Sequence, residues 1–112
     1  MPAITTNVEF SHIAREWRCK WSIDSDKKSL SELQDLLTRH LSTIKNTPGV
    51  VSVQRVVCGG CLDFKVIIKL DAAAYGDFEK SGHGVEAAFL DAMKSITGVS
   101  TVETQTYTLE TL

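Results

Sequence analysis

The sequence predicts one α+β domain in which a strand, a helix and a strand are followed by a second set of the same three elements. Alternating apolar residues predict strands at Glu16–Ile23, Val51–Val57 and Leu62–Leu70. Pro48–Val53 and Thr97–Val102 resemble each other, as PGVVSV and TGVSTV, at the point where each predicted helix ends. With right-handed crossovers, two such halves give a ferredoxin-like βαββαβ sandwich, a four-stranded antiparallel sheet with two helices on one face.

The length and composition fit one small domain. The chain has 112 residues, and 43% of them are hydrophobic, which is ordinary for a globular protein with a single core. Residues 1–12 are polar and have no clear period, so we expect a flexible N-terminal tail or a short added strand there. Residues 13–112 are expected to form the single ferredoxin-like domain.

Charge and hydropathy argue against several classes of protein. The formal net charge is -2, so the chain has no overall basic field and nucleic acid is not an expected partner. The apolar runs are far shorter than the roughly 20 residues that span a bilayer, so no membrane association is expected. The N-terminus lacks a basic segment followed by an apolar one, which indicates a cytoplasmic protein. Three cysteines, an odd number, favour free thiols over a disulfide framework.

The first half begins with a half-buried strand and continues into a helix. Trp17 and Trp21 lie on one face of the strand and are expected to pack in the core. Ser29 and Glu32 have the spacing of a capping box, so the helix is predicted to begin there, and Pro48 cannot continue it. The apolar stripe of this helix consists of Leu30, Leu33, Leu37, Leu41 and Ile44.

A β-hairpin joins the last strand of the first half to the first strand of the second half. Gly59 and Gly60 separate two strand patterns, and a two-residue glycine connection favours a type I′ or II′ turn because glycine tolerates positive φ. Residues 71–84 are expected to form a loop or a short helical turn. A second helix then ends at Gly98, and residues 100–109 form the last strand. The apolar positions of the second helix are Val85, Phe89, Met93 and Ile96.

The C-x-x-C motif of Cys58 and Cys61 allows three interpretations. A redox thiol usually lies at a helix N-terminus, where the dipole lowers its pKa, and no helix is predicted here. A tetrahedral zinc site needs two more ligands, and the sequence has no second C-x-x-C or H-x-x-H to provide them. The motif therefore favours two small residues flanking a tight turn, with a metal site or a redox pair at Cys58 and Cys61 as the alternatives.

Two further groups of residues are candidates for a site. Glu79, His83 and Glu86 could form an acid–base cluster, although Gly82 and Gly84 leave its geometry undetermined. The sheet face away from the helices is predicted to be charged, and it is either a solvated surface or the surface for a ligand or for a second copy of the chain. It would carry Arg18, Lys20, Asp63, Lys65, Lys69, Glu103 and Gln105.

With these elements placed, the chain resembles the guanine-nucleotide-exchange domain of translation elongation factor 1-beta. The resemblance covers roughly residues 17–112. It rests on the strand CKWSIDSD before a leucine-rich helix, on the hairpin VVCGGCLDFKVIIKLD, and on the late segment SITGVSTVE. It implies a ferredoxin-like fold and a translational G-protein as partner, with the hairpin tip and the last strand pressing on the nucleotide pocket.

The chain departs from that family at two places. The family has a lysine pair after the hairpin turn, where this chain has Leu62 and Asp63. Eukaryotic members have a lysine next to the last residue, where this chain has Thr111 after Glu110. A carboxylate and a hydroxyl cannot replace an ammonium inserted near magnesium, which counts against exchange activity.

The sequence thus predicts a small protein-binding domain, similar to the elongation factor 1-beta exchange domain, that acts through its hairpin tip. No catalytic residue and no cofactor are identified, and the sequence does not indicate an enzyme. The alternatives are a thiol-based metal or redox module and a ligand-binding or oligomeric domain that uses the open sheet face. The predicted partner-binding residues are Cys58, Gly59, Gly60, Cys61, Asp63 and Lys65.

Overall fold

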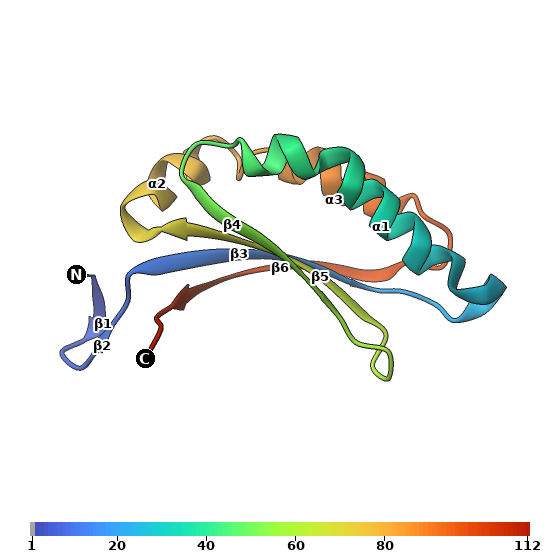
Figure 1. Ribbon diagram of the computed structural model, residues 1–112, viewed down its shortest axis with the longest axis horizontal. Helices are drawn as coiled ribbons and strands as arrows, with labels where there is room; N and C mark the ends of the chain where they lie inside the picture. The colour runs from blue at the N-terminus through green and yellow to red at the C-terminus, as the bar shows by residue number, and fades with distance from the viewer. Residues whose placement is uncertain (1) are drawn as a thin grey trace.

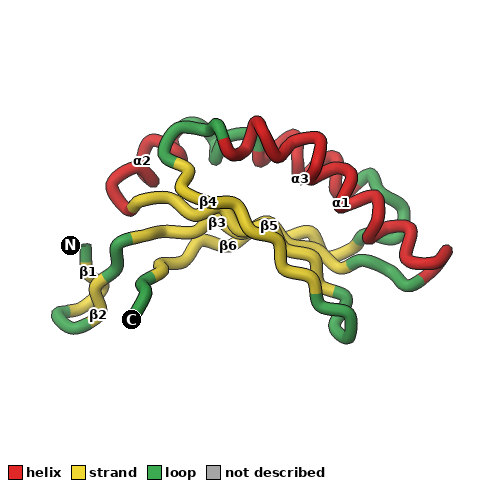
Figure 2. Tube along the Cα trace, viewed as in Figure 1, coloured by secondary structure: helices red, strands yellow, loops and turns green. Residues whose placement is uncertain are grey.

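The computed structural model describes residues 2–112 and has two layers, a twisted antiparallel sheet and three helices that cover one of its faces (Figure 1 and Figure 2). The sheet order is β4-β5-β3-β6, so β5 and β3 are central. This confirms the predicted ferredoxin-like α+β fold. The elements are β3 (His12–Lys20), α1 (Asp24–Lys45), β4 (Val50–Val57), β5 (Asp63–Asp71), α2 (Ala72–Lys80), α3 (Glu86–Lys94) and β6 (Ser100–Leu109).

The core lies between the sheet and the helices. Trp17 on β3 pairs with Val66 on β5 and with Thr104 on β6, so alternate residues of the three strands point to the same side. On the central strands this side is apolar and is buried beneath Leu33 of α1 and Phe89 of α3. The predicted apolar alternation therefore places the core correctly.

Helix α1 begins earlier than the capping-box pattern predicts. Ser29 is buried inside the helix, and its hydroxyl donates to the Ser22 carbonyl at 3.3 Å and accepts from the Ser22 amide at 2.9 Å. The capping box at Ser29 is therefore wrong, because this hydroxyl fastens the helix to the preceding loop instead of capping it. Ser25, Asp26 and Lys27 have φ of 53°, 58° and 61°, so the first residues assigned to α1 wind in the left-handed sense.

The β4–β5 hairpin is present, but its turn differs from the prediction. The Cys58 amide donates to the Asp63 carbonyl at 3.0 Å, which closes a loop from Gly59 to Leu62. Positive φ falls on Leu62, at 62°, and on neither glycine of this loop. The two-residue type I′ or II′ turn is thus wrong, because four residues, Gly59 to Leu62, separate the last pair of the hairpin and longer hairpin loops place a left-handed residue at their end.

Helix α2 lies where a loop or short helical turn was expected. Its sequence AAAYGDFEK contains Gly76, a poor helix former, and gives only a short periodic signal. Tyr75 and Phe78 are buried from this helix, so tertiary packing rather than propensity stabilises it. This helix accounts for the difference between the two predicted helices and the three observed.

Residues before the main sheet form a small hairpin of their own. Strands β1 (Ala3–Thr5) and β2 (Val8–Glu9) pair with each other and not with the four-stranded sheet. Ile4 and Val8 are exposed there. The radius of gyration is 15.0 Å, against about 13 Å for a compact domain of this length, so the molecule is elongated. Within residues 2–112, no helix is both long and apolar enough to cross a membrane.

Candidate functional site

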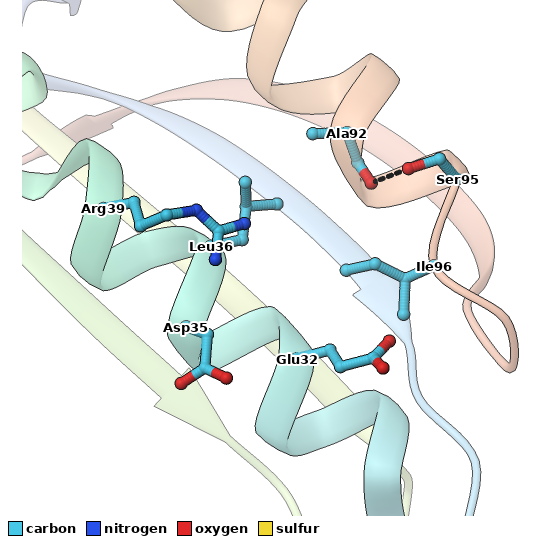
Figure 3. A pocket seen from close by; sticks show the side chains of 7 residues that line it. All are labelled: Glu32, Asp35, Leu36, Arg39, Ala92, Ser95 and Ile96. Carbon is cyan, nitrogen blue, oxygen red and sulfur yellow. Dashed lines mark hydrogen bonds between the residues drawn. The ribbon is translucent and has the colours of Figure 1, made fainter.

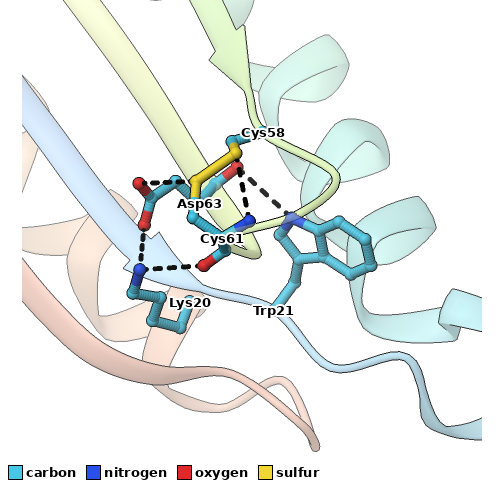
Figure 4. Close-up of a disulfide and its surroundings, with 5 residues drawn as sticks. All are labelled: Lys20, Trp21, Cys58, Cys61 and Asp63. Atoms are coloured by element: carbon cyan, nitrogen blue, oxygen red, sulfur yellow. Dashed lines mark hydrogen bonds and ion pairs between the residues drawn. A yellow bond between two sulfur atoms is a disulfide. The ribbon is translucent and has the colours of Figure 1, made fainter.

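Of the predicted partner-binding residues, Cys58, Cys61 and Asp63 lie together at the end of the β4–β5 hairpin (Figure 4). Cys58 and Cys61 form a disulfide, with their Cα atoms 5.5 Å apart. The prediction of free thiols is wrong for this pair, because the hairpin loop brings both side chains to bonding distance. Cys19, the third cysteine, is free and buried. Lys65 does not join the tip loop; with Asp63 it lines a small hollow of about 190 Å³ on the open sheet face.

The tip is fastened to the end of β3. The Lys20 ammonium donates to the Cys61 carbonyl at 2.9 Å and pairs with the Asp63 carboxylate. The Trp21 indole donates to the Asp63 carbonyl at 3.2 Å. The hydrogen bond from Lys20 lowers the pKa of Asp63, so this carboxylate stays ionised at neutral pH. Among residues 2–112, no three His, Cys, Asp or Glu side chains are grouped to hold a metal ion.

A second group of polar side chains, the interlayer cluster, lies between the sheet and helices α2 and α3. Its centre is Glu86, at the start of α3. Glu86 Oε1 accepts from Arg15 Nε and from Trp17 Nε1, both at 2.7 Å, and its Oε2 accepts from Arg15 Nη2 at 3.2 Å. His83 Nδ1 lies 3.3 Å from the same Oε2. One carboxylate thus gathers a guanidinium, an indole and an imidazole.

The cluster continues to β6 and α2. Arg15 Nη1 donates to Thr106 Oγ1 at 2.8 Å, and the Tyr75 hydroxyl lies 2.9 Å from the same Thr106 oxygen. These contacts connect three elements, β3, β6 and α2, in one hydrogen-bond network. The interlayer cluster is defined by Arg15, Trp17, Tyr75, His83, Glu86 and Thr106.

The cluster is shielded from solvent without being sealed. The exposed fractions of the Arg15, His83 and Glu86 side chains are 16%, 18% and 13%, while Trp17 is fully buried. The hydrogen bond to Glu86 raises the pKa of Arg15 above its usual value, so this guanidinium stays charged at any physiological pH. A charged pair of this kind at low exposure can hold an anion or share a proton with a ligand.

Aromatic rings form the walls around the cluster. The Trp17 and Phe89 ring centroids are 4.9 Å apart, and His83 lies 5.6 Å from Phe78 and 6.2 Å from Tyr75. The polar groups of the cluster are thus packed among aromatic rings, of which Trp17 and Phe89 are fully buried.

The loop between α2 and α3 brings His83 to the cluster. Gly82, His83 and Gly84 have φ of 83°, 61° and 68°, and positive φ is unfavourable for a histidine. The loop carries this strain while it holds His83 beside Glu86. A glycine on each side allows the loop to change its path at little cost.

The sequence identified part of this cluster. His83 and Glu86 were grouped there with Glu79, but Glu79 lies exposed on α2 and influences the cluster only through its charge, which contributes to raising the pKa of Arg15. Trp17 was placed in the core, which is correct, while Arg15 and Tyr75 were missed. A signal for Arg15 existed, because it shares the strand parity of Trp17 and so places a charge on the apolar face.

The open sheet face carries a second buried carboxylate, Glu16. Its exposed fraction is 4% although no helix covers this face. The Tyr107 hydroxyl donates to Glu16 Oε1 at 3.1 Å, and Arg18 Nη1 donates to Oε2 at 3.4 Å. Burial, together with the charge of Glu16, raises the pKa of Tyr107 to about 12. The predicted charged residues of this face, such as Lys20 and Arg18, do lie on it.

A groove of about 290 Å³ also lies between α1 and α3 on the outer surface of the helices (Figure 3). Glu32, Asp35 and Arg39 line it from α1, and Ile96 lines it from the segment after α3. Charged groups dominate its rim, and the Ser95 hydroxyl is already satisfied by the Ala92 carbonyl at 2.8 Å. The groove offers fewer converging polar groups than the interlayer cluster.

No known family model and no curated protein matches this sequence. Solved structures do match. One assigned as an antibiotic biosynthesis monooxygenase from Deinococcus radiodurans has 13% identity and a TM-score of 0.67, over 89% of this chain and 94% of that one. A monooxygenase of Streptomyces coelicolor, in complex with nanaomycin D, has 15% identity and a TM-score of 0.65, over 92% and 90%. SnoaB, a cofactor-independent oxygenase from Streptomyces nogalater, has 13% identity and a TM-score of 0.59, over 91% and 96%.

These likenesses establish the fold, and they correct the predicted relationship. These three similar structures are described as monooxygenases or an oxygenase, not as exchange domains of elongation factor 1-beta, so that resemblance and the exchange function are wrong. Glycine hairpins and a Gly-Val after a helix recur in many ferredoxin-like domains, so they did not distinguish the two groups. The G-protein partner was implied by that resemblance alone. Binding through Cys58 to Lys65 stays a prediction.

Proposed function

We propose that this chain binds an acidic aromatic small molecule at the interlayer cluster and acts on it as an oxygenase. The observation that carries the proposal is the Glu86 carboxylate, which holds Arg15, Trp17 and His83 in one partly shielded, aromatic-walled position. The names of the similar structures, among them a cofactor-independent oxygenase and a monooxygenase with bound nanaomycin D, support the same class of chemistry.

The cluster has the groups that such a reaction needs. With Nδ1 of His83 donating to Glu86, Nε2 is the basic nitrogen and can take a proton from an acidic carbon or phenol. The Arg15 guanidinium would stabilise the resulting anion. An electron-rich anion of this type can reduce O₂ directly. Oxidation of a methylene to a carbonyl by one O₂, with water as the other product, needs no outside reductant.

The α2–α3 loop is the proposed entrance. Gly82 and Gly84 flank His83, so a shift of this loop would open the cluster and a return would shield the anion from water. The cytoplasmic location, which rests on the N-terminal sequence, stays a prediction.

We also propose that a second copy of the chain covers the open sheet face. Glu16 is buried there without a covering helix, and Ile67 lies beside it at the centre of the face. The elongated shape and the exposed Ile4 and Val8 of the β1–β2 hairpin would extend this contact. The mass of the chain in solution tests this.

The ligand proposal is tested with two probes, nanaomycin D for binding and a hydroxyanthrone for turnover. Quenching of tryptophan fluorescence should report binding close to Trp17, and O₂ uptake should accompany appearance of the quinone. Glu86→Gln should weaken binding at least tenfold, whereas the control Asp77→Asn, at an exposed carboxylate of α2, should not. Absence of binding at millimolar probe, or equal binding by both variants, would refute the site.

A further inference from the structure

The disulfide between Cys58 and Cys61 has no role in the proposed ligand site. It lies at the tip of the β4–β5 hairpin, whereas the interlayer cluster lies beneath α2 and α3 (Figure 1). Any role of this disulfide is therefore separate from ligand binding at the interlayer cluster. An inference about it therefore goes beyond the proposed function and can succeed or fail independently.

Stabilisation of the fold does not account for this bond. A disulfide stabilises mainly by restricting the unfolded chain, and the effect grows with the length of the loop it closes. Here the two cysteines are only three positions apart. The Cys58 amide already bonds the Asp63 carbonyl at 3.0 Å, so the ladder closes the same loop without help from the sulfurs. Loss of the disulfide would leave the hairpin in place.

The bond is open to attack by another thiol. Gly59 and Gly60 have no neighbouring atoms within 4 Å of where a Cβ would stand, so nothing covers the loop that carries the sulfurs. Cys61 is exposed and Cys58 is half-buried. An attacking thiolate must approach a sulfur along the line of the S–S bond, and Cys61 is the more exposed residue of the two.

The surroundings of the two sulfurs also differ, and the difference favours attack on Cys61 with Cys58 as the leaving thiolate. The Cys61 amide lies 3.1 Å from Cys58 Sγ, where it can donate to a thiolate and stabilise it as a leaving group. Asp63 Oδ2 lies 3.3 Å from Cys61 Sγ and disfavours a thiolate there. The Lys20 ammonium pairs with Asp63 and reduces the repulsion that this carboxylate would exert on an incoming anion.

The remaining cysteine does not interfere. Cys19 is 2% exposed, and burial raises its pKa to about 12. A thiol of this kind is neither a nucleophile nor a resolving partner at neutral pH. Cys58 and Cys61 thus form a self-contained pair.

We propose that Cys58 and Cys61 are a thiol–disulfide exchange site for low-molecular-weight thiols. A monothiolate attacks Cys61 Sγ, forms a mixed disulfide with it, and displaces Cys58 as the thiolate, which then takes a proton. A second monothiolate attacks the sulfur of the bound thiol and releases Cys61 as a thiolate. The balance is one protein disulfide and two thiols giving one protein dithiol and one external disulfide.

The first test is equilibrium of the whole chain with glutathione at defined ratios of its reduced and oxidised forms. Intact mass should change by the two hydrogens of a dithiol, reversibly and without loss of far-UV circular dichroism. The Trp21 indole is bonded to Asp63 beside the disulfide, so fluorescence should rise on reduction. A disulfide that resists reduction until the protein unfolds, or that does not re-form from the dithiol, would overturn the proposal.

The second test uses the direction of attack. Cys61→Ser leaves Cys58 with its amide donor, and Cys58→Ser leaves Cys61 beside Asp63. The pH dependence of alkylation by iodoacetamide should give a lower pKa for Cys58 by about one unit, a roughly tenfold difference in thiolate at neutral pH. Adding Asp63→Asn to the Cys58→Ser variant should lower the pKa of Cys61 and so reduce the difference between the pKa values of the two cysteines. Equal values, or the reverse order, would overturn the mechanism; neither test involves the ligand site.

Discussion

A shielded carboxylate lies on each side of the central strand β3, Glu86 of α3 on one side and Glu16 of β3 on the other, and the two are held in different ways. On the helix-covered side Glu86 receives the guanidinium of Arg15, the indole of Trp17 and the imidazole of His83. On the open side Glu16 receives one hydroxyl, from Tyr107, and a longer contact from Arg18. Both are shielded from water, but only the first is fully matched by charge-assisted hydrogen bonds.

The difference separates two kinds of surface. Beneath the helices the protein itself excludes water, so a charge there must be paired and the pairing creates a fixed site. On the open face only neighbouring side chains shield Glu16, with Ile67 beside it on the adjacent strand. We have proposed that a second copy of the chain covers this face, since the helices of this chain lie on the other side of the sheet. The first surface therefore suits a small ligand and the second suits another sheet.

Removal of the Glu86 carboxylate should have the largest effect on stability. Glu86→Ala leaves Arg15 charged and mostly buried without its partner, which costs about 3 kcal/mol of unfolding free energy. Glu16→Ala should cost about 1 kcal/mol, since Arg18 can reach solvent. Urea denaturation of both variants measures the difference. If Glu16→Ala proves as costly as Glu86→Ala, the distinction between the two sides of β3 fails.

Removal of one donor to Glu86 should have a smaller effect. Trp17→Phe keeps an aromatic ring in the core and deletes the indole N–H that bonds Glu86 at 2.7 Å. The loss should be about 2 kcal/mol, as for other hydrogen bonds to charged groups. Trp21→Phe, which deletes a bond to a neutral carbonyl instead, is the matched control and should cost less in the same urea titration.

A charge at the centre of the open face should weaken self-association. Ile67→Lys should reduce dimer affinity at least tenfold, equivalent to about 1.4 kcal/mol, because an ammonium would be desolvated in the interface. Light scattering during size-exclusion chromatography gives the mass. Thr43→Lys, on the exposed side of α1, should leave the dimer intact. A monomeric parent protein, or a dimeric Ile67→Lys variant, would contradict the second-copy proposal.

Changing the Tyr107 phenol should have the smallest effect on stability, and the direction of its pH dependence follows from its raised pKa. Its folded pKa of about 12 lies above the ordinary value of about 10, so the folded state favours the neutral phenol. The stabilisation is complete below pH about 10 and is lost as the pH rises towards 12. Tyr107→Phe should cost about 1 kcal/mol below pH 10 and remove that loss. A phenolate absorbance difference between parent and variant, centred near pH 10, would refute the raised pKa.

Local patterns predicted most of the fold. Strand alternation and helix spacing depend on backbone geometry that short segments express by themselves, so β3, β4, β5, β6 and the apolar faces of α1 and α3 were all expected. The exceptions depend on contacts. Ser29 has the spacing of a cap, but it bonds Ser22 because the end of β3 lies beside α1. Helix α2 has a weak signal and forms because Tyr75 and Phe78 can be buried.

The candidate site could be predicted only in part. Arg15 was missed, although its place on the apolar side of the strand is a signal for a buried counter-charge, since an unpaired buried guanidinium is too costly. The sequence could not say that Glu86, 71 positions later, is that partner. Likewise, the spacing of Cys58 and Cys61 allowed a redox pair, a metal site or a plain turn, and the odd number of cysteines favoured free thiols.

The sequence by itself determined the ferredoxin-like topology, the parity of each strand and the position of a C-x-x-C at a hairpin tip. The tertiary structure decided that Glu86 meets Arg15, that Glu16 is buried on the open face, and that the two tip sulfurs are bonded. The physical reason is one of range. Periodicity reports which side of an element faces the core, whereas pairing of charges and sulfurs depends on which distant elements pack together.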